Sequence, residues 1–176
     1  MQPLPHLPRT FRELVEADLR AAARLIIKIQ DELDWHIRIA TPEGDYRLAL
    51  TMPGDAAARA EILRHLATFL AWKQAAAFCL VVETYVPDAV YATGISRRER
   101  HNCMARITRT PTPWTAANFG AVEWLPAAAI DPVVVALLPT EPRPMTPKEI
   151  SALQKWFGVE GKFPAVHVES REVRGV

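Results

Sequence analysis

The chain changes its hydrophobic period several times, and each change predicts a new element. Between Phe11 and Leu33, apolar residues recur every three or four positions with charged residues between them. This is the spacing of an amphipathic helix. Thr10 and Glu13 stand before and within its first turn, in the order of a capping box. The pattern therefore predicts a long N-terminal helix over residues 11–33.

Two segments that alternate strictly follow this helix. Residues 35–40 and residues 46–51 each place an apolar side chain at every second position, which is the period of a half-buried strand. Pro42 and Gly44 lie between them and are typical turn residues. The pattern predicts a β-hairpin.

A second helix and a buried strand come next. Asp55 can cap a helix over residues 56–74, whose apolar residues share one face. Residues 77–82 are continuously apolar, which favours a strand covered on both faces and central in its sheet. The strand runs on to Val86 and stops at Pro87.

The second half of the chain is less regular. Residues 87–101 show no clear period and are expected to form a loop, with further strands over Cys103 to Arg109 and Phe119 to Leu125. A short helix is expected from residue 132 to 138. Four prolines follow in residues 139–147, and a last helix should run to Phe157 and end at Gly158.

This order of elements predicts an α+β fold. We expect a mainly antiparallel sheet of about four or five strands, with helices packed on one face, because hairpins and short connections dominate. Residues 1–138 should form one domain and residues 139–147 a proline-rich linker. Residues 148–176 should form a short C-terminal helix and tail that pack on the same domain.

Composition narrows the class of partner. The chain has 21 Lys and Arg against 20 Asp and Glu, a net charge of +1, so it lacks the surplus typical of proteins that coat nucleic acid or anionic membranes. No apolar run is long enough for a membrane helix, and the N-terminus does not resemble a secretory signal. Two isolated cysteines, Cys79 and Cys103, predict neither a disulfide scaffold nor a zinc site. We expect a cytoplasmic protein without metal or cofactor.

Three residues are weak candidates for acid–base chemistry: Glu83, His65 and His101. Glu83 ends the most apolar strand, where it either has a raised pKa or pairs with an arginine. His65 follows Glu61 by one helical turn, so the two side chains can meet. They could form an acid–base pair, serve as two metal ligands or make a weak surface ion pair. His101 and Cys103 would share one face of a strand, although a lone cysteine is more often a small core residue.

The most distinctive charge pattern lies between Arg97 and Arg109. Five arginines and one glutamate give this segment a local balance of +4. We expect Arg97, Arg98 and Arg100 to lie in a mobile loop and to bind a partner. Arg106 and Arg109 should lie on a strand and reach Glu83 across the sheet. Nucleic acid is a less favoured partner, because the segment lacks aromatic residues for base stacking.

The hypothesis favoured by the sequence is a non-catalytic binding or assembly module of a bacterial-type cytoplasmic protein. Its five tryptophans and long first helix suggest a homodimer, because tryptophan is enriched at interfaces. The alternative is that these tryptophans are ordinary core residues. Two alternatives stay open. One is a small enzyme with a Glu/His acid–base site, and the other is a nucleic-acid-associated protein that uses the Arg97–Arg109 segment.

Overall fold

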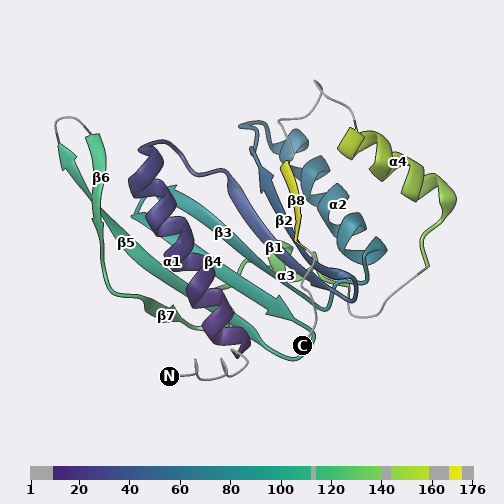
Figure 1. Ribbon diagram of the computed structural model, residues 1–176, viewed down its shortest axis with the longest axis horizontal. Helices are drawn as coiled ribbons and strands as arrows, with labels where there is room; N and C mark the ends of the chain where they lie inside the picture. Colours follow the sequence, from purple (N-terminus) through teal and green to yellow (C-terminus); the bar gives the residue numbers. More distant parts are fainter. Residues whose placement is uncertain (1–9, 112–113, 140–143, 159–166, 172–176) are drawn as a thin grey trace, which may run out of the picture.

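A computed structural model describes residues 10–111, 114–139, 144–158 and 167–171. Four α-helices and eight strands occupy these residues (Figure 1). The helices are α1 (Phe11–Ile29), α2 (Ala56–Trp72), α3 (Pro132–Val135) and α4 (Pro147–Gly158), with a 3-10 turn, η1 (Ala127–Ala129). The strands are β1 (Trp35–Thr41), β2 (Gly44–Leu50), β3 (Ala77–Tyr85), β4 (Asp88–Ser96), β5 (Arg100–Pro111), β6 (Trp114–Phe119), β7 (Glu123–Leu125) and β8 (His167–Arg171).

All of these strands belong to one sheet with antiparallel pairing throughout. Its order is β6-β5-β4-β3-β1-β2-β8, and β7 pairs with β5 outside this path. The predicted α+β class and the N-terminal helix followed by a hairpin are confirmed. The strand count exceeds the four or five expected.

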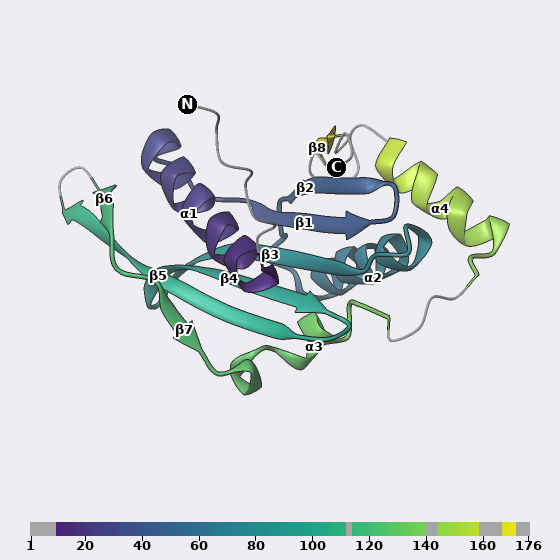
Figure 2. The same ribbon diagram turned by 60° about the horizontal axis from the view of Figure 1, so that its bottom comes forward.

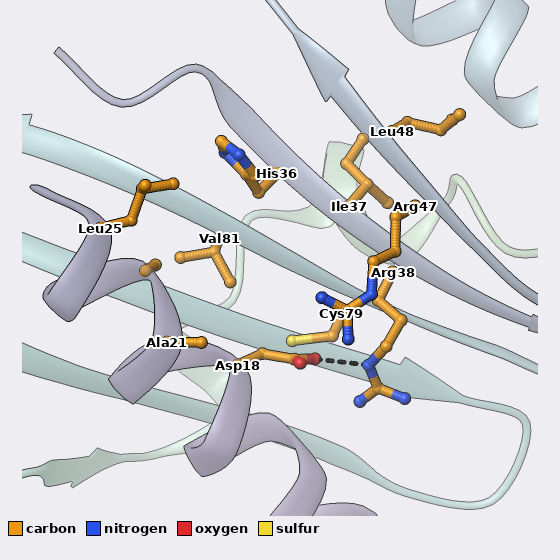
Figure 3. A pocket seen from close by; sticks show the side chains of 11 residues that line it. Asp18, Ala21, Leu25, His36, Ile37, Arg38, Arg47, Leu48, Cys79 and Val81 are labelled. Carbon is orange, nitrogen blue, oxygen red and sulfur yellow. Dashed lines mark hydrogen bonds and ion pairs between the residues drawn. The ribbon is translucent and has the colours of Figure 1, made fainter. Parts of the chain in front are cut away.

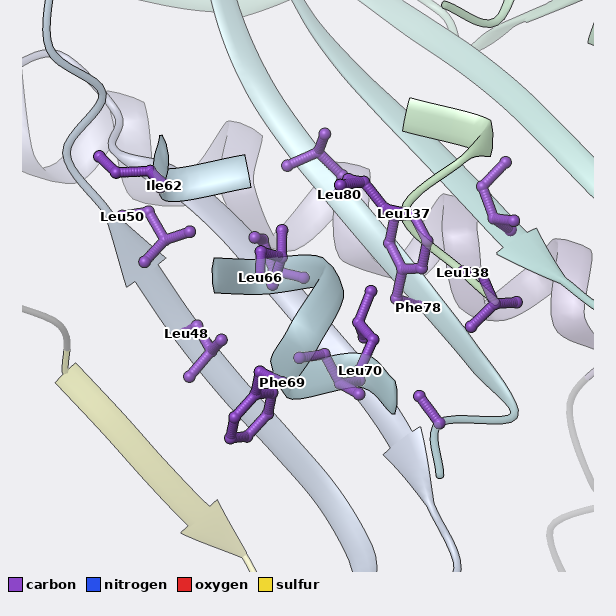
Figure 4. Packing of buried hydrophobic residues seen from close by; sticks show 14 of the residues in the cluster. Leu48, Leu50, Ile62, Leu66, Phe69, Leu70, Phe78, Leu80, Leu137 and Leu138 are labelled. Carbon is purple, nitrogen blue, oxygen red and sulfur yellow. The ribbon is translucent and has the colours of Figure 1, made fainter. Parts of the chain in front are cut away.

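Helices cover both faces of the sheet, whereas the sequence pattern suggested one (Figure 2). On one face, α1 crosses β3, β4 and β5 and buries Val15, Leu19 and Ile26. On the other face, α2 packs over β1, β2 and β3 around Leu66 and Phe78 (Figure 4). Strand β3 contributes to both cores, because alternate residues of its apolar run point to opposite faces. Its predicted central position is confirmed.

Helix α1 starts as expected and ends earlier. Thr10 and Glu13 form both hydrogen bonds of the capping box, at 2.7 and 3.2 Å. Gln30 takes a left-handed conformation at φ 56°, which terminates the helix after Ile29 instead of at residue 33. The short connection that follows brings Leu33 beside β3, where it is buried.

The predicted hairpin is also present. Strands β1 and β2 pair from Trp35↔Leu50 to Thr41↔Gly44. Gly44 has φ 131°, a conformation that side-chain-bearing residues rarely adopt. Helix α2 begins after Asp55, whose side chain accepts the Ala58 amide at 2.7 Å.

Three expectations for the second half were wrong. Residues 88–96, expected as a loop, form the central strand β4, which starts immediately after Pro87. The single strand expected over residues 119–125 is two strands, β6 and β7, that both pair with β5. The short helix expected over residues 132–138 is limited to Pro132–Val135.

The C-terminal part of the chain is described only in pieces. Helix α4 lies beside α2, and its Leu153 is fully buried in the α2-side core (Figure 1). Residues 167–171, expected in the C-terminal tail without a strand, pair with β2 as an edge strand. Part of the predicted linker, residues 140–143, lies outside the described residues. No helix in the described parts of the chain is long and apolar enough to cross a membrane.

Candidate functional site

Glu83 is held by a side chain of β5 and by the backbone of the connection between α1 and β1. Its side chain is 1% exposed and forms an ion pair with Arg109. Its other carboxylate oxygen accepts the Leu33 amide at 2.8 Å. Asp88 binds the same guanidinium at 2.8 Å. The prediction that Arg109 reaches Glu83 is confirmed, and the carboxylate has no oxygen left unengaged for a substrate.

Arg106 does not share this role. It pairs with Ala89 in the register and points to the opposite face of β5 from Arg109, because residues an odd number of positions apart on a strand face opposite sides. Its side chain is 64% exposed and approaches Glu123 at 3.9 Å. The expectation that Arg106 would also contact Glu83 was wrong.

His65 and Glu61 lie close together, as their spacing predicted. His65 Nε2 is 3.5 Å from a carboxylate oxygen of Glu61, and the His65 side chain is 13% exposed. Burial lowers the pKa of His65, and the neighbouring Arg64 lowers it further, while Glu61 partly opposes both effects. No group of three or more potential metal ligands occurs in the described residues.

His101 and Cys103 both point to the α1 side of β5 without forming a nucleophile–base pair. His101 binds Glu99 at 2.6 Å and packs between the rings of Phe11 and Trp124. Burial raises the pKa of Cys103 to about 12, so its thiol stays protonated at neutral pH. A protonated thiol is a poor nucleophile.

The three acid–base candidates are far from one another. His65 lies on α2, on the opposite face of the sheet from Glu83 and His101. In the register Glu83 pairs with Val90 and His101 with Gly94, four residues further along β4. At a rise of about 3.3 Å per residue, this offsets the two residues by roughly 13 Å along the strands, and β4 also lies between them.

Arg97, Arg98 and Arg100 lie at a short hydrogen-bonded turn, whereas a loop over residues 87–101 was expected. The turn joins β4 to β5, and Arg100 is already the first residue of β5. Ser96 closes the turn: its hydroxyl accepts the amides of residues 98 and 99 and donates to the carbonyl of residue 99. All three arginines are exposed, and none has a carboxylate partner among the described side chains. We call these three residues the arginine turn.

A half-open cleft of about 450 Å³ borders the arginine turn. Arg97 and Arg100 form one rim, and the segment around α3 forms the other. The lining residues are Ile95, Ser96, Arg97, Arg100, Val135, Ala136, Leu138 and Pro139. The volume lies within the range of about 300–1,000 Å³ that is typical of ligand pockets.

A second pocket, of about 140 Å³, lies on the other face, between α1 and strands β1, β2 and β3 (Figure 3). The α1-side face of β1 and β2 carries charged residues of both strands. Arg38 binds Asp18 at 2.7 Å and lies 3.6 Å from Asp45. Arg47 stands directly opposite Arg38 in the register.

Neither pocket could be predicted from the pattern of residues along the chain. Arg47, Arg38 and Cys79 form one row across β2, β1 and β3, although residues 38 and 79 are far apart in the chain. The alternation within each strand showed that these side chains share a face with other polar residues. Which residues become neighbours depends on strand order, which the pattern did not supply.

No protein-family model, no curated protein and no solved structure matches this chain. The case for a function therefore depends on the geometry of the arginine turn, the two pockets and the acid–base candidates.

Proposed function

We propose that this chain is a non-catalytic binding module that recognises an acidic, partly apolar segment of another protein at the arginine turn. The observation that carries the proposal is the position of Arg97 and Arg100 on the rim of the adjoining cleft. Their charges have no carboxylate partner among the described side chains, and Glu99, the acid of the same turn, is engaged by His101.

The chemistry of the cleft indicates what the partner offers. Guanidinium groups bind carboxylates through paired hydrogen bonds, which gives direction as well as attraction. Ile95, Val135 and Leu138 add an apolar wall beside these charges. A peptide that carries carboxylates around one apolar side chain satisfies both features.

The rigidity of the turn also favours binding. The hydrogen bonds of Ser96 fix the backbone that carries the arginines, so less conformational entropy is lost when a partner is bound. A catalytic role has weaker support. Glu83 is enclosed by Arg109 and Leu33, and the two candidate histidines lie on opposite sides of the sheet.

Nucleic acid is the less favoured partner. Single-stranded nucleic acid binds to basic grooves that also offer aromatic side chains for stacking. Among the described residues that line the cleft beside the arginine turn, none is aromatic. Three arginines can contact phosphates, but they offer no base-stacking platform.

A homodimer stays a prediction. The three tryptophans whose side chains are described, at positions 35, 72 and 124, are partly buried and pack against the two cores. They therefore give the dimer no added support. Sedimentation at micromolar concentration tests it directly, and a mass near 19.7 kDa would exclude a dimer under those conditions.

The binding proposal is tested by selection from a displayed library of random peptides. We expect enrichment of sequences in which Glu or Asp flank one large apolar residue. Changing all three arginines of the turn to Ala should remove this enrichment. A matched control changes Arg20, Arg24 and Arg64 to Ala, which removes the same charge from exposed helix positions and should leave selection intact.

A further variant separates anchoring in the cleft from simple charge attraction. Ala136 is exposed and lines the cleft, so Ala136→Trp should block the cleft while all the arginines remain. We expect it to remove the preference for the apolar residue. Unselective enrichment of acidic peptides by the wild type, or equal losses in the turn and control variants, would refute the proposal.

A further inference from the structure

The pocket between α1 and strands β1–β3 is independent of the arginine turn. It lies on the other face of the sheet and shares no residue with the cleft. Ala21 and Leu25 of α1 lie opposite Val81 of β3 (Figure 3). Ala22 also lines the pocket, so much of the wall is apolar. Small side chains on this face of α1 leave space that a larger residue would fill.

The negative charge that lines this pocket is already engaged. Asp18 accepts a hydrogen bond from Arg38 Nε at 2.7 Å. Burial raises the pKa of Cys79 well above its ordinary value, and the charge of Asp18 raises it further, so the thiol that lines the pocket remains protonated. Asp18 is therefore a poor anchor for a bound cation.

The positive charge is less fully engaged. Arg38 is neutralised by Asp18 and Asp45. Arg47 is exposed, lines the pocket and forms no ion pair with any described side chain. Figure 3 shows it reaching across β1 toward α1. Like charges that face each other directly on a sheet destabilise it, and an anion beside Arg47 would offset that repulsion.

His36 adds a second polar group to the lining. Its Nδ1 lies 2.7 Å from the Asp34 carbonyl, so Nδ1 carries the proton that is donated there. Nε2 of His36 is then the unprotonated nitrogen of the neutral ring. In the neutral ring Nε2 is an acceptor, so His36 forms part of the wall of the pocket and offers no hydrogen bond to a carboxylate.

We propose that this pocket binds a small monocarboxylate with a short apolar body. The carboxylate would contact Arg47 at the rim, and the apolar body would contact Ala22, Leu25 and Val81. A volume of about 140 Å³ corresponds to roughly five water molecules at ~30 Å³ each. This space suits a short-chain acid, and the neighbouring Asp18 disfavours a more highly charged anion such as phosphate.

The test is a titration of the full chain with sodium butyrate, followed by amide chemical shifts. Butyramide has the same shape without the charge and serves as the ligand control. We expect saturable shifts in residues 18–25, 36–38 and 79–81 with butyrate, and binding at least about tenfold weaker with butyramide. Equal binding of the two compounds, or no saturable shift with butyrate, would overturn the proposal.

Two variants locate the site. Arg47→Gln should weaken butyrate binding about tenfold, whereas Arg24→Gln, on an exposed position of α1, should leave it unchanged. Ala21→Leu narrows the pocket at an exposed position, so it should block butyrate without unfolding the chain. Unchanged binding in Ala21→Leu would place the anion on the exposed arginine alone and refute the pocket as its site.

Discussion

Glu83 shows how one residue can carry a structural role that resembles a catalytic one. A carboxylate at the end of an apolar strand has two interpretations in sequence, an active-site acid or a buried ion pair. The contacts with Arg109 and Leu33 favour the second. The sequence could identify Glu83 as exceptional and could propose its partner, but only the strand register decides between Arg106 and Arg109.

This interpretation predicts a large stability cost for Glu83→Gln. Removing one charge of a buried ion pair costs about 3 kcal/mol, and here the Arg109 guanidinium would keep Asp88 as its carboxylate partner but lose the more deeply buried one. Arg106→Ala removes an exposed arginine from the other face of the same strand and should cost less than about 1 kcal/mol. Urea unfolding measures both. Similar costs for the two variants would contradict the buried-pair assignment.

His65 offers a second test at the residue scale. Since burial lowers its pKa, the folded chain favours the neutral imidazole. The unfolded chain takes up the proton first as pH falls, so the contribution of His65 to stability is present above 6.5 and is lost from there downward.

An imidazole NMR titration should therefore give a pKa below 6.5 for His65. Glu61→Gln removes a neighbour that raises this pKa, so the value should fall further in that variant. A pKa at or above 6.5 would show that the ring is less buried than described. A higher pKa in Glu61→Gln would show that Glu61 does not stabilise the protonated ring.

At the scale of elements, sequence patterns succeeded where local chemistry determines the structure. The capping box at Thr10, the turn at Gly44 and the cap at Asp55 are each formed by residues close in sequence. Strand β4 was missed because both of its faces are covered and it contains small residues such as Ala89, Ala92 and Gly94. Strand β8 was missed because it forms only by pairing with the distant β2.

Gly94 has a specific role in how α1 meets the sheet. A Cβ at this position would lie 2.2 Å from Val15 Cγ2 and 3.1 Å from the Phe11 ring. The absent side chain therefore allows the helix to approach β4 closely. Sequence alone gave no reason to single out this glycine, because the contact joins residues that are far apart in the chain.

We predict that Gly94→Ala destabilises the fold by about 1–3 kcal/mol through overpacking. Gly54→Ala is the control, since nothing lies within 4 Å of a Cβ there. In the double variant Gly94→Ala with Val15→Ala, the loss should be smaller than the sum of the two single losses. Additive losses, measured by thermal or urea unfolding, would mean that α1 does not rest on Gly94.

At the scale of the whole molecule, the sheet separates two binding regions. The arginine turn and its cleft lie near α3, whereas the pocket beside Arg47 lies between α1 and strands β1, β2 and β3. The sequence predicted the arginines as a partner site, and their role stays a prediction. The cleft could not be predicted, because it forms where α3 returns to the β4–β5 turn.

The central claim is that the arginine turn recognises an acidic protein segment and not nucleic acid. The most direct measurement is fluorescence anisotropy at ~0.15 M salt with two labelled probes, a glutamate peptide with one central leucine and a random single-stranded DNA. We predict that the wild-type chain binds the peptide more tightly than the DNA, and that changing Arg97, Arg98 and Arg100 to Ala removes peptide binding. Sub-micromolar DNA binding that is lost in the same variant would contradict the account and assign the turn to nucleic acid.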